Sequence, residues 1–235
     1  MEMALRIEKT AFILIVSGVI LAAQDLTFSV RHNHLHKYGV GTLTFTENTI
    51  QWEEPGKSHE HSQLWTYEQI QRLELAQDQV RIVTYEDIRW QVGRDRAFLF
   101  DHIPADLASR VYPFLIAKLD QRFQAHVYDP SIEPIYETPA KLLLGRAGSN
   151  GVLKIGPDRI TFNGGDRGQS RTWRYSDITI FSNAGPFDLT LATLEGENRI
   201  QLKRPLPEAT YTDLWRRISE SNGLTTYNAQ VAHAH

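Results

Sequence analysis

Hydrophobic and polar residues alternate along two stretches of the chain, one in each half. In the first stretch, Leu43 and Phe45 alternate with polar residues, and Ile50 and Trp52 do so again after a short turn. A period of two is typical of strands that bury one face and expose the other. The pattern therefore predicts antiparallel β-hairpins at these positions.

The same pattern recurs later in the chain, in the same order and at nearly constant spacing. Three pairs of segments match, at offsets of 110, 108 and 109 residues: 41–52 with 151–162, 65–70 with 173–178, and 80–86 with 189–195. An ordered self-similarity of this length indicates two copies of one fold. Because Trp65 and Trp173 recur in phase with the strand alternation, as do Tyr67 and Tyr175, we expect these aromatic residues in the core.

The strands at the end of the first copy are placed by a weaker match. Phe98 and Phe100 form a candidate last strand, which would match Ile200 and Leu202 at an offset of 102 residues. On that alignment a separate strand at 88–92 belongs to an insertion of about one hairpin in the first copy.

Each copy closes with a helical pattern. In the second copy, Pro207 fits a first helical turn, and apolar residues then follow at i, i+3, i+4 and i+7. They are Tyr211, Leu214, Trp215 and Ile218. In the first copy the helix is expected to start at Pro104 and to kink at Pro113. Its apolar stripe comprises Leu107, Val111, Phe114, Leu115, Leu119 and Phe123.

The number of short strands, a W-x-Y-x-x-I block and one closing helix together resemble the pleckstrin-homology-like superfold, most closely its GRAM-type branch. The residues that carry the resemblance are Gly41, Leu43, Ile50, Tyr67 and Ile70, and again Gly151, Leu153, Ile160, Tyr175 and Ile178. The resemblance covers roughly 38–124 and 148–222. It implies a mainly β fold with α, in which two tandem modules each form a six- to seven-stranded, partly open antiparallel barrel with a C-terminal amphipathic helix. Because superfolds host many activities, it implies a fold rather than a function.

These patterns divide the chain into five segments. A linker between the copies contains Pro130, Pro134 and Pro139, and a proline-rich segment of this kind is extended and semi-stiff. The expected segments are 1–23, a signal peptide or N-terminal anchor; 25–126, the first module; 127–139, the linker; 140–224, the second module; and 225–235, a flexible tail.

The N-terminus predicts export. Arg6 and Lys9 precede an apolar run over 10–23, which is shorter than the ~20 residues that span a bilayer. The run favours a cleaved secretory signal of a bacterium-like cell, with an uncleaved anchor or a buried element of a cytosolic fold as alternatives. We therefore expect a periplasmic or extracellular protein, either free or anchored by residues 10–23.

Composition narrows the range of functions. The net charge is −3 and neither half has a basic excess, which argues against nucleic-acid binding. The chain has no cysteine, so it has no disulfides and no thiolate chemistry. G-x-S-x-G, H-E-x-x-H and G-K-[ST] motifs are missing, and no nucleophile–base set is readable. We therefore expect a non-enzymatic binding protein, and the resemblance to the pleckstrin-homology-like superfold implies that a protein or peptide partner binds at an open sheet edge beside the helix.

Histidines are clustered in the first copy. His32, His34 and His36 alternate along one expected strand face, and His59 and His61 alternate later. Neutral imidazoles on adjacent strands could hold a divalent transition metal, the one cofactor that the sequence suggests. The alternative is a solvated or partner-facing strand, which the repeat favours because His32 falls on Leu142 of the second copy.

Cations gather in the first hairpin and following loop of the second copy. The resemblance implies a second alternative, because some members of the superfold bind inositol phospholipids through lysines and arginines in this region. The candidate lipid- or anion-binding residues are Lys154, Arg159, Arg167 and Arg171. The corresponding hairpin of the first copy is acidic instead, with Glu47, Glu53 and Glu54.

Overall fold

The computed structural model describes residues 25–33, 38–56, 62–88, 91–144, 147–165 and 169–223. Within them the fold is mainly β with two α-helices, which confirms the predicted class. The strands are β1 (Leu26–Asn33), β2 (Tyr38–Phe45), β3 (Thr49–Glu53), β4 (Gln63–Thr66), β5 (Ile70–Ala76), β6 (Gln79–Ile88), β7 (Gln91–Asp101), β8 (Phe123–His126), β9 (Tyr136–Leu144), β10 (Ala147–Ile155), β11 (Arg159–Gly164), β12 (Arg171–Arg174), β13 (Ile180–Gly185), β14 (Asp188–Thr193) and β15 (Gly196–Leu202). The helices are α1 (Leu107–Lys118), α2 (Glu208–Ser221) and the short 3-10 helices η2 (Tyr67–Gln69) and η3 (Tyr175–Asp177).

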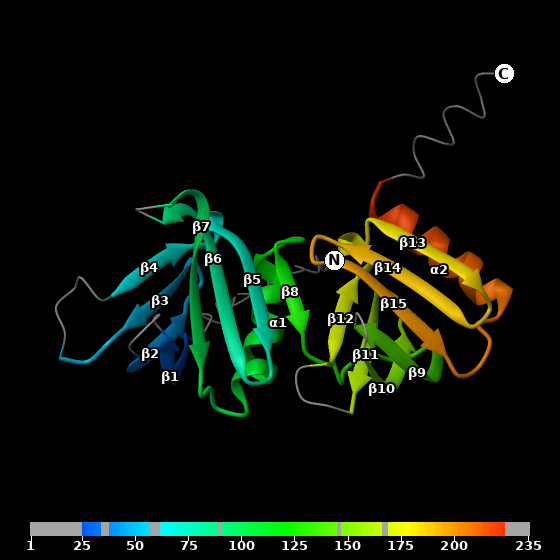
Figure 1. Cartoon of the computed structure of the whole chain (residues 1–235), viewed down its shortest axis with the longest axis horizontal. Coiled ribbons are helices and arrows are strands. Elements are labelled where there is room, and N and C mark those ends of the chain that lie inside the picture. Colours follow the sequence, from blue (N-terminus) through cyan, green and yellow to red (C-terminus); the bar gives the residue numbers. More distant parts are fainter. Residues whose placement is uncertain are drawn as a thin grey trace, which may run out of the picture.

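The strands of the described residues form one continuous sheet, which bends into two halves (Figure 1). The order along the sheet is β13-β14-β15-β9-β10-β11-β12-β8-β5-β6-β7-β1-β2-β3-β4. The N-terminal half comprises β1–β8 and α1, and the C-terminal half comprises β9–β15 and α2. Strand β8 lies between β5 and β12 and so joins the halves, while β13 and β4 are the two edges.

Each half has its own hydrophobic core. Trp65 and Tyr67 are buried in the first core, and Trp173 and Tyr175 are buried in the second. This confirms the prediction that the recurring aromatic residues are core residues. The predicted signal or anchor (1–23) and tail (225–235) lie outside the described residues. Within the described part, no helix is long and apolar enough to cross a bilayer.

The repeated glycines are explained by strand packing. A Cβ atom on Gly41 would lie 2.1 Å from the carbonyl oxygen of Glu53, and one on Gly151 would lie 2.1 Å from that of Asn163. A Cβ atom this close would push the neighbouring strand away. Only glycine therefore fits where the two strands approach so closely. The same residue serves the same purpose in both halves.

The repeated tyrosines also serve one purpose. The Tyr67 hydroxyl donates to the carbonyl of Thr46 at 2.9 Å, and the Tyr175 hydroxyl donates to that of Gly156 at 2.5 Å. Each bond ties a 3-10 helix to the turn between the second and third strands of its half. Because a buried phenol needs a hydrogen-bond partner, the tyrosine fixes this turn as well as filling the core.

The end of the first copy differs from the prediction. Residues 88–92 are not a separate strand: β6 runs to Ile88 and β7 starts at Gln91, so the insertion is a longer hairpin. Phe100 pairs with His32 of β1, as Ile200 pairs with Leu142 of β9. The correct offset between the last strands is therefore 100 residues rather than 102.

The helix of the first copy is shorter than predicted. It ends at Lys118, and the carboxylate of Asp120 then accepts the backbone N–H of Arg122 in an Asx turn. Phe123 therefore belongs to β8 and not to the helical stripe. At 3.6 residues per turn it falls in phase with Leu119, which is why periodicity alone assigned it to the helix.

Three smaller expectations need correction. Pro207 is the N-cap of α2 rather than a residue of its first turn. Trp215, predicted in the buried stripe of α2, is 49% exposed. Strand β9 starts at Tyr136, so the last part of the expected linker 127–139 is sheet. Pro113 does lie inside α1, as expected.

An ion pair links strand β1 to strand β7 in the N-terminal half. The Arg31 guanidinium donates to both carboxylate oxygens of Asp101 at 2.7 and 2.8 Å, and lowers the pKa of Asp101 to about 2. A depressed folded-state pKa gives stability above the unfolded pKa that is lost as pH falls toward 2. We expect Asp101→Asn to cost about 1 kcal/mol at pH 7 after solvent screening, and clearly less at pH 2, where about half of the Asp101 carboxylates are protonated in the folded state. Urea unfolding at both pH values measures this, and equal losses would contradict it.

Candidate functional site

The predicted histidine cluster is only partly described. His34, His36, His59 and His61 lie outside the described residues. His32 is buried in the core, where its ring lies 4.9 Å from that of Phe100 and 5.6 Å from that of Trp52. No group of three or more histidine or carboxylate side chains in the described ranges could hold a metal ion.

The predicted cations of the C-terminal half are paired with carboxylates. Arg159 bonds Asp129 at 2.5 Å, Lys154 lies 3.6 Å from Glu137, and Arg171 lies 3.4 Å from Glu195. Arg167 lies outside the described residues. Each of the other three therefore has a carboxylate partner within 4 Å.

A different feature sets the two halves apart, namely what lies against the fifth strand of each. In the N-terminal half, β8 adds to the edge of β5 in parallel, with Leu73 opposite Phe123. The N–H of Leu73 donates to the carbonyl of Arg122 at 2.9 Å. The Phe123 ring is buried and lies 6.1 Å from the ring of Tyr112 on α1. A strand of this chain therefore fills the space between β5 and α1.

The corresponding strand of the C-terminal half is β13. Leu73 is opposite Ile82, as Phe181 is opposite Leu191, so Phe181 takes the place of Leu73. Leu73 is fully buried, whereas Phe181 is only partly buried and its neighbour Ile180 is 59% exposed. Within the described residues β13 pairs with β14 alone, so its outer edge is open.

Helix α2 packs an aromatic side chain against β13. The ring of Tyr211 stacks on that of Phe181 at 5.1 Å. Trp215 follows one turn later and is 49% exposed. It comes directly after the buried Leu214, as Tyr112 comes directly after the buried Val111. The β13–α2 edge, meaning β13 with Tyr211 and Trp215, thus repeats the β5–α1 site without its added strand.

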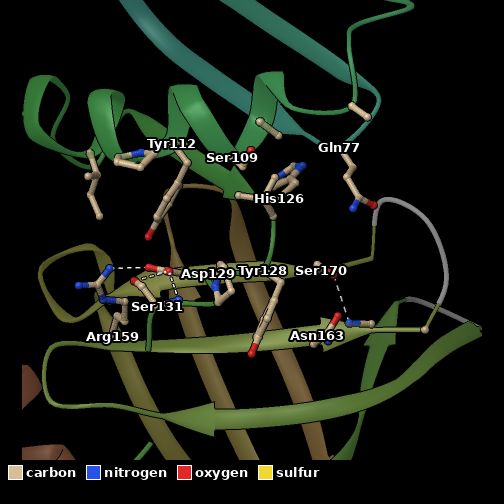
Figure 2. Close-up of a pocket in the computed structure, with 18 residues that line it drawn as sticks. Gln77, Ser109, Tyr112, His126, Tyr128, Asp129, Ser131, Arg159, Asn163 and Ser170 are labelled. Carbon is tan, nitrogen blue, oxygen red and sulfur yellow. Dashed lines mark hydrogen bonds and ion pairs between the residues drawn. The ribbon is translucent and has the colours of Figure 1, made fainter. Parts of the chain in front are cut away.

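A second candidate site is a pocket of about 530 Å³ where the two halves meet, called here the junction pocket (Figure 2). One wall is α1, another is the segment after β8, and the third is the end of β11 with the residues after it. The lining residues are Gln77, Ala105, Ala108, Ser109, Tyr112, Pro113, Ile116, His126, Val127, Tyr128, Asp129, Pro130, Ser131, Arg159, Asn163, Gly164, Gly165 and Ser170.

Asp129 organises one end of the junction pocket. Its carboxylate accepts bonds from the backbone N–H and the hydroxyl of Ser131 at 2.9 and 2.6 Å, besides the bond from Arg159. Burial by itself raises the pKa of Asp129, but these bonds and the charge of Arg159 lower it below its ordinary value on balance. Asp129 is therefore an anion at neutral pH, and it fixes the linker to β11.

Arg174 connects the two halves through hydrogen bonds to the end of α1. It donates to the carbonyls of Ile116, Leu119 and Asp120, at 3.0, 2.9 and 2.6 Å, and so caps the C-terminus of α1 from the other half. The same guanidinium bonds Asp177 at 2.8 Å. A neighbouring contact places Nε2 of His126 2.9 Å from Glu195. The junction is thus a polar, hydrogen-bonded interface.

The sequence does not predict these contacts. Arg174 lies in the repeated segment 173–178 and Asp129 in the expected linker, and neither pattern indicates what the side chain will bond. The Asp129–Pro130–Ser131 triplet is a turn signal, but a turn signal does not say what the aspartate will bond. The difference between β13 and its counterpart β5 depends on β8 covering β5, and the sequence does not predict that pairing.

A comparison with solved structures found similarities with low TM-scores. The C-terminal domain of an unknown protein from Leishmania infantum is 13% identical, with 46% of this chain and 92% of that chain covered and a TM-score of 0.31. The Spt16D Pob3N heterodimer is 15% identical over 73% of this chain and 84% of that chain, with a TM-score of 0.33. A scan against family models gave no match, and a search of curated proteins gave none. These TM-scores are too low for either likeness to carry an argument about this chain.

Proposed function

We propose that this chain is a non-enzymatic binding protein, built from two tandem pleckstrin-homology-like modules, which holds an extended segment of a partner protein at the β13–α2 edge. The observation that carries the proposal is the pairing of β8 with β5. It is an example, inside the same molecule, of a strand bound at the corresponding edge. As part of the same proposal the chain is exported, so its partner is a protein of the periplasm or the cell exterior.

Strand addition explains the chemistry of this edge. Unpaired backbone groups of an edge strand supply hydrogen bonds, and pockets for alternate side chains supply specificity. Since Leu73 donates its N–H to the added strand, the N–H of Phe181 is the corresponding donor in the C-terminal half. By the same correspondence the bound segment runs parallel to β13 and places a large apolar side chain against Trp215, where Phe123 meets Tyr112.

The rival functions have less support in the geometry. Lipid binding needs cations free to meet phosphates, whereas Lys154, Arg159 and Arg171 each have a carboxylate partner. A metal site would rest on histidines outside the described residues, apart from the buried His32. The exposed apolar side chains beside β13 favour a protein segment instead.

The proposal is tested by selecting displayed random peptides against the full chain. We expect enrichment of extended sequences that carry an aromatic or large aliphatic residue. Binding should fall at least about tenfold in Trp215→Glu, which places a charge against the apolar side chain of the bound segment. It should fall similarly in Ile180→Lys, because lysine on an edge strand disfavours pairing. Fluorescence anisotropy of a labelled enriched peptide measures both effects.

The matched control is Ala209→Glu, a charge added to the exposed side of α2 away from β13. It should bind the peptide as the unchanged chain does. A chain ended at Gly223 tests whether residues 224–235 compete for the edge, since their removal would then tighten binding. If neither Trp215→Glu nor Ile180→Lys weakens the binding of the enriched peptides, the proposed site is refuted.

A further inference from the structure

The junction pocket has the size and composition of a small-molecule site, and it is separate from the β13–α2 edge. Its volume of about 530 Å³ lies within the range of roughly 300–1,000 Å³ that ligand pockets occupy. Apolar side chains from both the helix and the linker form its walls, among them Ala108, Pro113, Ile116 and Val127. Figure 2 shows the helix above this space and β11 below it.

Among the described residues that line the pocket, the charged side chains are paired with opposite charges. Asp129 and Arg159 are the acidic and basic residues of the lining, and they bond each other at 2.5 Å. Asp129 is 3% exposed, and Ser131 occupies its other oxygen. Arg159 also bonds both oxygens of Asp158 at 2.9 Å. Because a charged ligand would lose its hydration without gaining a free counter-charge, the site favours an uncharged molecule.

One polar group at this end is buried and only weakly bonded. Tyr112 is 7% exposed, and its hydroxyl interacts with Asp129 and Arg159 without reaching normal hydrogen-bond geometry to any residue that the structure describes. Burial raises the pKa of Tyr112 to about 12, and the charge of Asp129 adds to this effect while that of Arg159 opposes it, so the phenol keeps its proton. In Figure 2 the side chain points from α1 toward Asp129. A buried donor without a well-formed hydrogen bond is costly, and a ligand acceptor would relieve that cost.

We propose that the junction pocket binds an uncharged small molecule with an apolar body and a carbonyl or ether oxygen, which accepts the hydrogen bond of Tyr112. The apolar body lies along Ala108, Pro113 and Ile116. The opposite end, near Gln77 and Ser170, supplies amide and hydroxyl groups for a second polar substituent. Since its walls come from both halves, a bound ligand also strengthens the junction between them.

A solvatochromic fluorophore tests the proposal. The probe is 6-propionyl-2-(dimethylamino)naphthalene, an uncharged aromatic ketone, titrated with the full chain. We expect saturable binding with blue-shifted emission, because the ring system leaves water for an apolar site. Ser109→Trp fills the pocket from its exposed rim and should weaken binding by at least about tenfold. Tyr112→Phe removes one hydrogen bond and should weaken it by about three- to tenfold.

Two controls keep the test decisive. Ala117→Trp adds the same bulk on an exposed face of α1 outside the pocket, and should bind the ketone unchanged. Thermal melting checks that all three variants remain folded. No saturable binding of the ketone would overturn the proposal, as would binding that Ser109→Trp leaves intact. Equal or tighter binding of the anionic 8-anilinonaphthalene-1-sulfonate at the same site would overturn the preference for an uncharged ligand.

Discussion

Replacing Trp173 by alanine is expected to lower the free energy of unfolding of the C-terminal half by about 3–5 kcal/mol, the usual cost of truncating a large buried aromatic side chain. Trp173 is 3% exposed and belongs to the second core, together with Ile160, which lies opposite it on β11. Trp65→Ala should cost the N-terminal half a similar amount, because Trp65 packs edge-on against Phe98 at 4.7 Å. Chemical denaturation of the full chain, followed by fluorescence and circular dichroism, measures both.

The control is Trp215→Ala, which removes a tryptophan that is 49% exposed. It should change stability by less than about 1 kcal/mol, as is usual for surface substitutions. If Trp173→Ala were as stable as the unchanged chain, the second core would not depend on the residue that the repeat identifies.

Much of the fold could be predicted because its determinants are local. The close approach at Gly41 and Gly151 and the core tyrosines Tyr67 and Tyr175 each leave a short, position-specific mark in the sequence. The pairing of β8 with β5 leaves no such mark, since residues 123–126 form a strand only where another strand meets them. A four-residue segment in phase with the preceding helix cannot be assigned by periodicity.

Replacing Arg174 by alanine is expected to cost about 3 kcal/mol and to uncouple the two halves. The substitution removes three hydrogen bonds to the end of α1 and leaves the buried carboxylate of Asp177 without its ion-pair partner. Breaking a buried pair from one side is strongly destabilising, because the remaining charge is desolvated without compensation. In a urea titration the two cores should then unfold in separate transitions.

The same variant should acquire a pH dependence of known sign. Burial already raises the pKa of Asp177 above its ordinary value, although Arg174 lowers it in part. Without Arg174 the pKa rises further, so the folded state binds a proton that the unfolded state has lost. Stability of Arg174→Ala should therefore fall as pH increases from 5 to 7. Adding Asp177→Asn should remove this dependence.

The control for Arg174 is Arg216→Ala, which deletes an exposed arginine whose partners Asp213 and Glu220 lie on its own helix. Exposed pairs of this kind contribute at most about 1 kcal/mol. Equal losses of stability in Arg174→Ala and Arg216→Ala would show that the bonds across the junction stabilise the fold no more than an exposed ion pair does. A single unfolding transition in Arg174→Ala, with unchanged midpoint, would contradict the expected uncoupling.

The sequence predicts the type of the candidate site but not its position in the fold. An open sheet edge beside a helix is expected from the resemblance, and within the described residues β13 is an edge strand on which Ile180 is exposed. Which half carries it depends on the position of β8, and the junction pocket depends on how α1 meets β11. Both are contacts between segments far apart in the sequence, where neither repeat nor periodicity carries information. Asp129 and Arg159 illustrate this, since thirty residues separate the two ends of their bond.

The narrow connection between the halves also determines how the molecule responds to force. Strands β12 and β8 share a single residue pair, Thr172 with Ala125, whereas β8 and β5 share four. Tension along the chain therefore opens the β12–β8 contact, with the bonds of Arg174, before it disrupts either core. Once the ion pair between Asp129 and Arg159 is also broken, the covalent connection 127–135 can straighten to roughly 30 Å, at about 3.4 Å per residue. The protein thus behaves mechanically as two stiff bodies on a short tether, in which a small extension is absorbed without unfolding.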